Sequence, residues 1–205
     1  MKWPSRRGLV IGAIALGVLV VVATAGTLWY VSTERTAATV YAETLARVQA
    51  TRASSTSETQ VTLVRQLEAT LAQYPSARLA ADAAYELANL RFAQRQYPAA
   101  RNAYEIALAR GTPTIRSLAR AGVAYTWEAE KDYAKAADAF QAAVDAVGPA
   151  DFMFEELALD LARTQELAGR RERAIETYRR VLKETPKTPR ADEIRIRLAN
   201  LGASP

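Results

Sequence analysis

A repeated pattern of small and aromatic residues limits what this chain can fold into more than any other feature does. Three segments follow the pattern, and they begin 36 and 38 residues apart. Each has an alanine thirteen residues after its start, an aromatic residue four positions later and a small or branched residue three positions after that. The segments are Leu87–Leu108, Val123–Val144 and Leu161–Leu182, with alanines at Ala100, Ala136 and Ala174 and rings at Tyr104, Phe140 and Tyr178.

This spacing predicts antiparallel pairs of α-helices. Two packed helices need a small residue where their backbones come closest, and a ring fills the gap to the next pair. The prolines agree, since Pro98 and Pro113 fit first turns and Pro186 follows the third pair. Asp151 is the expected N-cap of the helix after Gly148 and Pro149. We therefore predict an all-α fold whose main part is an α-solenoid of three helix–turn–helix repeats over residues 77–188.

A period of about 34 residues with these small and aromatic positions resembles the tetratricopeptide repeat. The glycine that is usual in the first helix of such a repeat is an alanine in all three copies. The resemblance implies a concave groove, lined by the first helix of each pair, that binds other proteins or peptides. The positions that it implies for this groove are Asp82, Tyr85, Asn89, Phe92, Leu118, Tyr125, Glu128, Leu159 and Arg163.

Two interpretations of the groove aromatics remain open. The rings of Tyr85, Phe92 and Tyr125 either serve as apolar anchors for a ligand or pack between successive repeats. One ligand class is excluded by the residues. Chaperone-binding relatives hold a C-terminal carboxylate with lysines, asparagines and an arginine, and here only Asn89 matches that set. Two of the corresponding positions are Glu156 and Asp160, which would repel a carboxylate.

A second feature is the uncharged stretch Gly8–Ser32, which is long enough to cross a bilayer as a helix. Lys2, Arg6 and Arg7 precede it, so the positive-inside rule places residues 1–7 in the cytoplasm and the rest across the membrane. We expect a transmembrane signal anchor at residues 8–32 in a bacterial inner membrane, with Trp29 and Tyr30 at the interface and the repeats in the periplasm.

The same stretch has the parts of a cleaved secretory signal. Its basic start and apolar centre are followed by Ala23-Thr24-Ala25, which fits a cleavage site. Cleavage there would release a soluble periplasmic protein. The apolar stretch continues well past Ala25 and ends in Trp-Tyr, which favours the retained anchor.

The segments on either side of the repeats are also predicted to be helical. Residues 33–76 form a juxtamembrane helix pair, a degenerate repeat, in which Thr36–Ala53 is either a stalk or dimer seam or a continuation of the membrane helix packed on Val61–Gln73. Residues 189–205 form a capping helix that Pro189 opens and Gly202 ends. Ile194, Leu198 and Leu201 are its expected apolar contacts with the last repeat.

The residue inventory excludes much chemistry. The chain has no cysteine and no histidine, so thiolate chemistry, the usual general base and the commonest metal ligand are lacking. No motif for catalysis, a cofactor or a metal is present, so we expect no enzyme. Three of the 27 basic residues precede the apolar stretch, which leaves 24 against 22 acidic residues, too even a balance for nucleic-acid binding.

The order of segments resembles bacterial inner-membrane tetratricopeptide proteins such as the ancillary periplasmic subunit of the Sec translocon. That resemblance implies a membrane-anchored scaffold that assists secretion, folding or envelope assembly, with the translocon or periplasmic chaperones as partners. The alternative is a secreted periplasmic adaptor, cleaved near Ala25, that serves polysaccharide or cell-division machinery.

Overall fold

The computed structural model describes the backbone of residues 6–51 and 57–204, with side chains from residue 15 onward in the first range and from residue 58 in the second. These described residues contain nine α-helices and no strand, which confirms the all-α prediction. Most of the predicted cytoplasmic segment 1–7 and of the break at Ser54–Ser57 lies outside the described residues.

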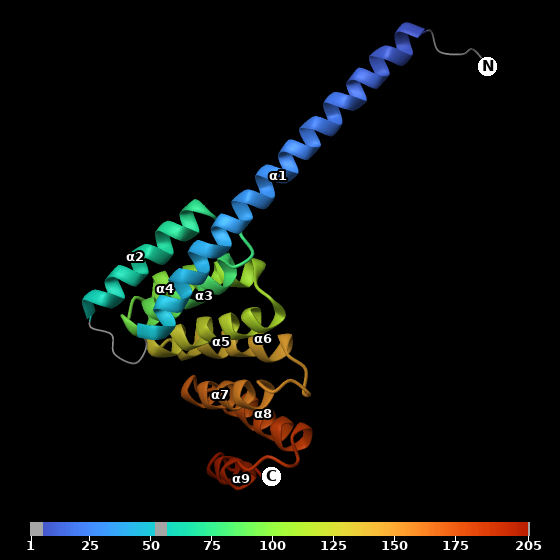
Figure 1. Cartoon of the computed structure of the whole chain (residues 1–205). Helices are drawn as coiled ribbons and strands as arrows, with labels where there is room; N and C mark the ends of the chain where they lie inside the picture. Colours follow the sequence, from blue (N-terminus) through green and yellow to red (C-terminus); the bar gives the residue numbers. More distant parts are fainter. Residues whose placement is uncertain (1–5, 52–56, 205) are drawn as a thin grey trace, which may run out of the picture.

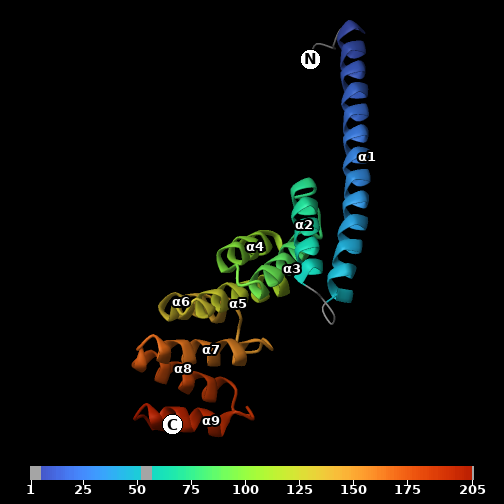
Figure 2. The same cartoon turned by 90° about the vertical axis from the view of Figure 1, so that its left-hand side faces the viewer.

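Helix α1 runs without a break from Arg6 to Thr51 (Figure 1). Its 46 residues correspond to about 69 Å of helix at 1.5 Å per residue. The N-terminal part stands clear of the other helices in both views, whereas the C-terminal part lies against α2, Ser57–Gln73 (Figure 2). Residues 36–51 thus continue the apolar helix and pack on α2, as one of the two sequence interpretations predicted.

Three helix pairs follow and stack in chain order away from α1 (Figure 2). The last helix lies at the far end of the stack. The pairs are α3 (Ala80–Ala93) with α4 (Tyr97–Arg110), α5 (Pro113–Ala129) with α6 (Tyr133–Ala146), and α7 (Phe154–Leu167) with α8 (Arg171–Glu184), followed by α9 (Ala191–Asn200).

Small residues are buried where the helices meet. The three repeat alanines, Ala100, Ala136 and Ala174, are each 0% exposed. The alanines that replace the usual glycine, at positions 88, 124 and 162, are also fully buried. A glycine is needed elsewhere, at Gly122, where an added Cβ would lie 2.3 Å from the Tyr104 ring. The backbone of α5 therefore rests directly on an aromatic ring of the preceding pair.

Tyr41 connects α1 to the repeats. Its side chain is 0% exposed, and its hydroxyl donates hydrogen bonds to the carbonyls of Thr70 (3.2 Å) and Tyr74 (3.0 Å) at the end of α2. Burial, with a smaller contribution from the charge of Glu34, raises the pKa of Tyr41 to about 12. Ala37 and Val48 on the same helix face are buried too. The C-terminal part of helix α1 is thus part of the folded domain. No flexible linker separates it from the apolar part of the same helix.

The C-terminal end follows the prediction with two corrections. Ile194 and Leu198 of α9 are buried against the last pair, and Gly202 ends the helix with φ +68°. However, Pro189 lies in the preceding turn, and α9 begins at Ala191. Asp151 is not the N-cap of α7, because its carboxylate accepts the N–H of Met153 inside the turn that precedes the helix.

Replacement of Ala136 by leucine should lower the free energy of unfolding by ~1–3 kcal/mol, because the site is closed and extra methylene groups strain a packed core. Ala142→Leu on the exposed face of the same helix is the control and should change little. Urea unfolding of the full chain in mild detergent, monitored by circular dichroism, measures the stability of both variants. Equal stability of the two variants would contradict the packing role.

Tyr41→Phe should lower the free energy of unfolding by about 1 kcal/mol at neutral pH, because two carbonyls lose a hydrogen-bond donor. The cost should shrink at alkaline pH. Since Tyr41 ionises near pH 10 in the unfolded chain and near 12 when folded, it lowers the stability of wild type between these values. The phenylalanine variant lacks this contribution and keeps only the loss that other buried tyrosines cause in both proteins. Unfolding curves at neutral pH and near pH 11 test this. A cost that stays constant across the range would contradict it.

Candidate functional site: a groove on the first helices

The largest apolar recess lies where α3, α5 and the start of α7 meet. It has a volume of about 480 Å³. We call this recess the groove. Five of the nine predicted positions line it, namely Tyr85, Asn89, Phe92, Leu118 and Tyr125. The first helices of successive pairs therefore bring together residues that are up to 40 positions apart in the sequence.

The groove aromatics both pack and line the surface. The ring of Tyr85 lies 5.9 Å from that of Tyr104, between centroids, and the ring of Tyr125 meets Phe140 edge to face at 5.1 Å. Phe92 packs in the same way on a ring of its own helix pair, Tyr97. Each of the three keeps part of its surface open. These ring contacts lie within single helix pairs, α3 with α4 and α5 with α6, so the rings pack inside their own repeats while part of each ring lines the groove. The role of the rings as ligand anchors stays a prediction.

Sequence reasoning missed the most exposed ring of the groove, Phe152. It lies in the turn before α7, lines the groove and is 82% exposed. Exposed apolar surface that is contiguous, as this ring is with the apolar groove lining, is a feature of contact sites. The only signal for it in the sequence was an aromatic residue directly after the Gly148-Pro149 turn, where no packing position was expected.

Asn89 lies between the groove and a second recess. That recess has a volume of about 460 Å³ and is lined by Val48, Leu63 and other residues at the end of α1 and on α2 and α3. Tyr85 and Asn89 line both recesses. The Asn89 side-chain oxygen accepts a hydrogen bond from the Tyr104 hydroxyl at 2.7 Å, which fixes the amide between them. An elongated ligand can thus extend from α7 to α1 along this side.

Two of the charged predicted positions, Glu128 and Arg163, are paired with each other. Arg163 bridges Glu128 of α5 and Asp160 of α7, with 3.0 Å from its Nη2 to Glu128 Oε2 and 2.8 Å to Asp160 Oδ1. The Tyr125 hydroxyl donates to Asp160 at 2.6 Å. The bonds to Glu128 raise the pKa of Arg163, and burial raises that of Tyr125. This network ties α5 to α7 and keeps one net negative charge.

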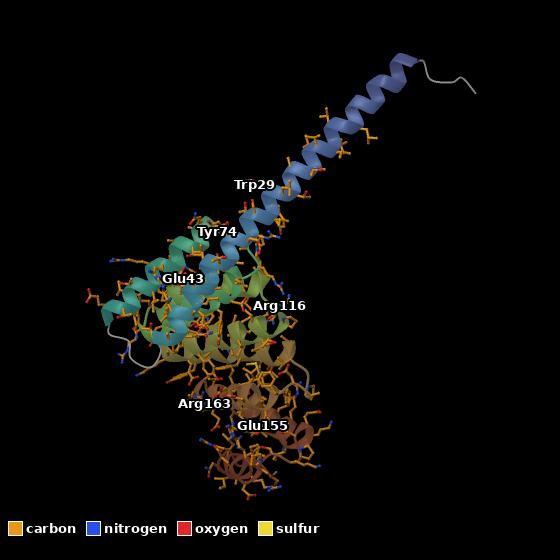
Figure 3. All side chains as sticks on the ribbon, in the orientation of Figure 1. Trp29, Glu43, Tyr74, Arg116, Glu155 and Arg163 are labelled. Carbon is orange, nitrogen blue, oxygen red and sulfur yellow. The ribbon has the colours of Figure 1, made fainter. Side chains whose placement is uncertain are left out.

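The remaining predicted positions lie outside the groove itself. Leu159 and Arg163 line a smaller recess of about 140 Å³ against α9, near Arg190 and Arg197. Figure 3 shows Arg163 in this part of the stack. Asp82 and Glu128 line none of these three recesses. Eight of the nine positions predicted as one surface are therefore divided between an apolar groove, a salt-bridge network and the α7–α9 contact, and Asp82 belongs to none of the three.

The described residues include no group of three or more acidic side chains arranged to hold a metal ion. The side chains that line the groove are mostly aromatic and aliphatic, with one amide, Asn89, and one carboxylate, Glu156. Such a surface offers hydrophobic contact and a few hydrogen bonds, which is the chemistry of recognition.

Comparison with known proteins agrees with the repeat architecture. Residues 128–199 match the family described as tetratricopeptide repeat. The match begins at the end of α5 and continues into α9. No curated protein matches the chain. Together with the stacked helix pairs, the match supports a tetratricopeptide repeat protein, and such repeats generally bind other proteins or peptides.

Arg163→Gln should destabilise the stack by roughly 1–3 kcal/mol, because Glu128 and Asp160 lose their shared cation in a partly buried site. The double variant with Glu128→Gln should lose less than the two single losses combined, since the residues act as one network. Arg173→Gln on the exposed face of α8 is the control and should be near neutral. Chemical unfolding measures all four, and additive losses would contradict the network.

Proposed function

We propose that this chain is a membrane-anchored scaffold that binds a segment of another protein in its groove. The observation that carries the proposal is the exposed Phe152 beside an apolar floor of Tyr85, Phe92 and Leu118. A folded monomer gains nothing by leaving such a ring in water, whereas an aromatic anchor is a frequent hot spot of protein interfaces. No catalytic group accompanies it, so binding is the proposed activity.

The charges favour a ligand segment that is apolar and basic. Glu156 lines the groove and has no ion-pair partner in the described part of the chain. The Arg163 network adds one further net negative charge. Lysine or arginine beside the apolar anchors of a ligand would complement this rim, and charge complementarity mainly sets specificity and association rate.

The anchor is supported by α1. Among the described residues, one helix is long and apolar enough to cross a membrane. Its apolar side chains face outward, and even Trp29 is 72% exposed. The hydroxyls of Thr24 and Thr27 donate to the helix carbonyls of Val20 (2.7 Å) and Thr24 (2.8 Å). Polar groups that are satisfied within their own helix are what a lipid environment requires.

The competing proposal is a cleaved, soluble adaptor. Cleavage after Ala25 would leave Leu28, Trp29 and Tyr30 exposed to water on a helix that continues into the folded domain. Because burial of apolar surface is favourable, we prefer the anchor. An intact N-terminus, measured by mass spectrometry on protein from an alkali-washed membrane pellet, supports it. A mature chain that begins near Gly26 overturns it in favour of the adaptor.

We further propose that the groove lies in the periplasm and that its partner class is the translocon or periplasmic chaperones. The basis is the basic segment 1–7 and the similarity in segment order to bacterial inner-membrane repeat proteins. Protease protection in spheroplasts tests the orientation. Digestion of the repeats only after the outer face is made accessible is the expected result.

Phe152→Ala should weaken ligand binding by about 2 kcal/mol, which is roughly 30-fold, as is typical for an anchor residue. The measurement is fluorescence anisotropy of short peptides that combine leucine or phenylalanine with lysine, titrated with the full chain in detergent. Ile196→Ala, at an exposed apolar position on α9, is the control and should change nothing. Equal weakening by both variants, or tighter binding of glutamate-bearing peptides, would contradict the proposed site.

A further inference from the structure

A second surface, at the point where α1 leaves the repeats, has the composition of a lipid contact. A recess of about 290 Å³ opens there, lined by Trp29 and Tyr30 of α1 and by the turn between α2 and α3 from Tyr74 to Ala77. Both α1 rings are largely exposed. Trp and Tyr are the residues enriched where a membrane helix meets the headgroups.

If α1 is the membrane anchor of the proposed function, the position of this recess relative to the bilayer can be estimated. The headgroup layer adds about 5–7 Å on each side of the hydrocarbon core, which is four or five residues of helix. With Trp29 and Tyr30 at the edge of the core, this layer extends to about Arg35. The backbone N–H of Arg78 donates to the Glu34 carboxylate at 2.9 Å. The turn is therefore held at headgroup depth.

Cations surround the recess. Arg35 and Arg78 are exposed, and Arg110 donates to the carbonyl of Pro75 at 3.0 Å. Arg116 is exposed at the start of α5, and Figure 3 places it on the same side of the stack as Tyr74. None of these four guanidinium groups is paired with a carboxylate within the described residues. The recess lining holds one acid, Glu34.

We propose that this juxtamembrane face, formed by Trp29, Tyr30, Arg35, residues 74–78, Arg110 and Arg116, binds the anionic headgroups of the bilayer that anchors the chain. The inference rests on the proposed membrane anchor. Phosphate groups complement the arginines, and the aromatic rings suit the boundary with the acyl chains. Because α1 continues without a break from its apolar part into the folded domain, this contact sets the tilt of the helix stack relative to the bilayer.

The test uses the natural absence of cysteine, which allows one labelled site per chain. The full chain carrying Ser76→Cys with a fluorophore is reconstituted into phosphatidylcholine vesicles, with or without phosphatidylglycerol. A phosphatidylcholine with a nitroxide on its headgroup serves as the quencher. Ser76 lies in the turn, and Asn200→Cys on α9 is the distant control. We expect quenching at position 76 that increases with phosphatidylglycerol, and little quenching at position 200.

Charge is tested in the same vesicles. Arg35→Gln, Arg78→Gln and Arg116→Gln together should abolish the increase caused by phosphatidylglycerol. The matched set Lys183→Gln, Lys187→Gln and Arg190→Gln removes three exposed charges at the far end and should keep the increase. Equal quenching at positions 76 and 200, or no dependence on the anionic lipid, overturns the inference.

Flotation after an alkaline wash separates this inference from the anchor on which it rests. A chain that floats with the vesicles but shows no preferential quenching at position 76 overturns the lipid contact alone. A chain that fails to float overturns the anchor and the lipid contact together, while the peptide titrations still test the groove independently.

Discussion

Close approach of helix backbones at buried alanines is the constraint on which the rest of the structure depends. Ala100, Ala136 and Ala174 are fully enclosed, and each belongs to the second helix of its pair. A helix pair of this size cannot bury its apolar face alone, so every pair depends on its neighbours. Larger side chains at these positions would separate the pairs. The groove exists because successive first helices are held at this short spacing.

The same residues therefore carry the fold and the site. Tyr125 packs on Phe140, holds Asp160 and lines the groove. A ligand cannot recruit Arg163 without breaking the link between α5 and α7. What remains available without disturbing the stack is the apolar floor, Phe152 and the unpaired Glu156. Recognition of a ligand by this surface would therefore depend mainly on hydrophobic contact, and the acid would favour apolar segments that carry a positive charge.

The repeats were predictable from the sequence because the small and aromatic positions record the packing directly. The groove was predictable in part. Tyr85, Asn89 and Tyr125 lie on regular helices, where spacing determines the face. The pairing of Arg163 with Glu128 was not predicted, since pairing across two helices depends on rotamers that no periodicity encodes. Phe152 was missed because its exposure depends on the path of a turn, and Asp151 was misassigned for the same reason.

The continuity of α1 determines how an anchored groove would work. A flexible linker lets a binding domain sample a large volume, and its effective concentration for a partner falls as that volume grows. Here the buried side chains of Tyr41 and Val48 fix α1 to the helix stack. The groove would then be confined to a narrow range of heights above the bilayer. Such a geometry favours a partner segment that emerges from the same membrane, and it disfavours one that must be retrieved from bulk solution.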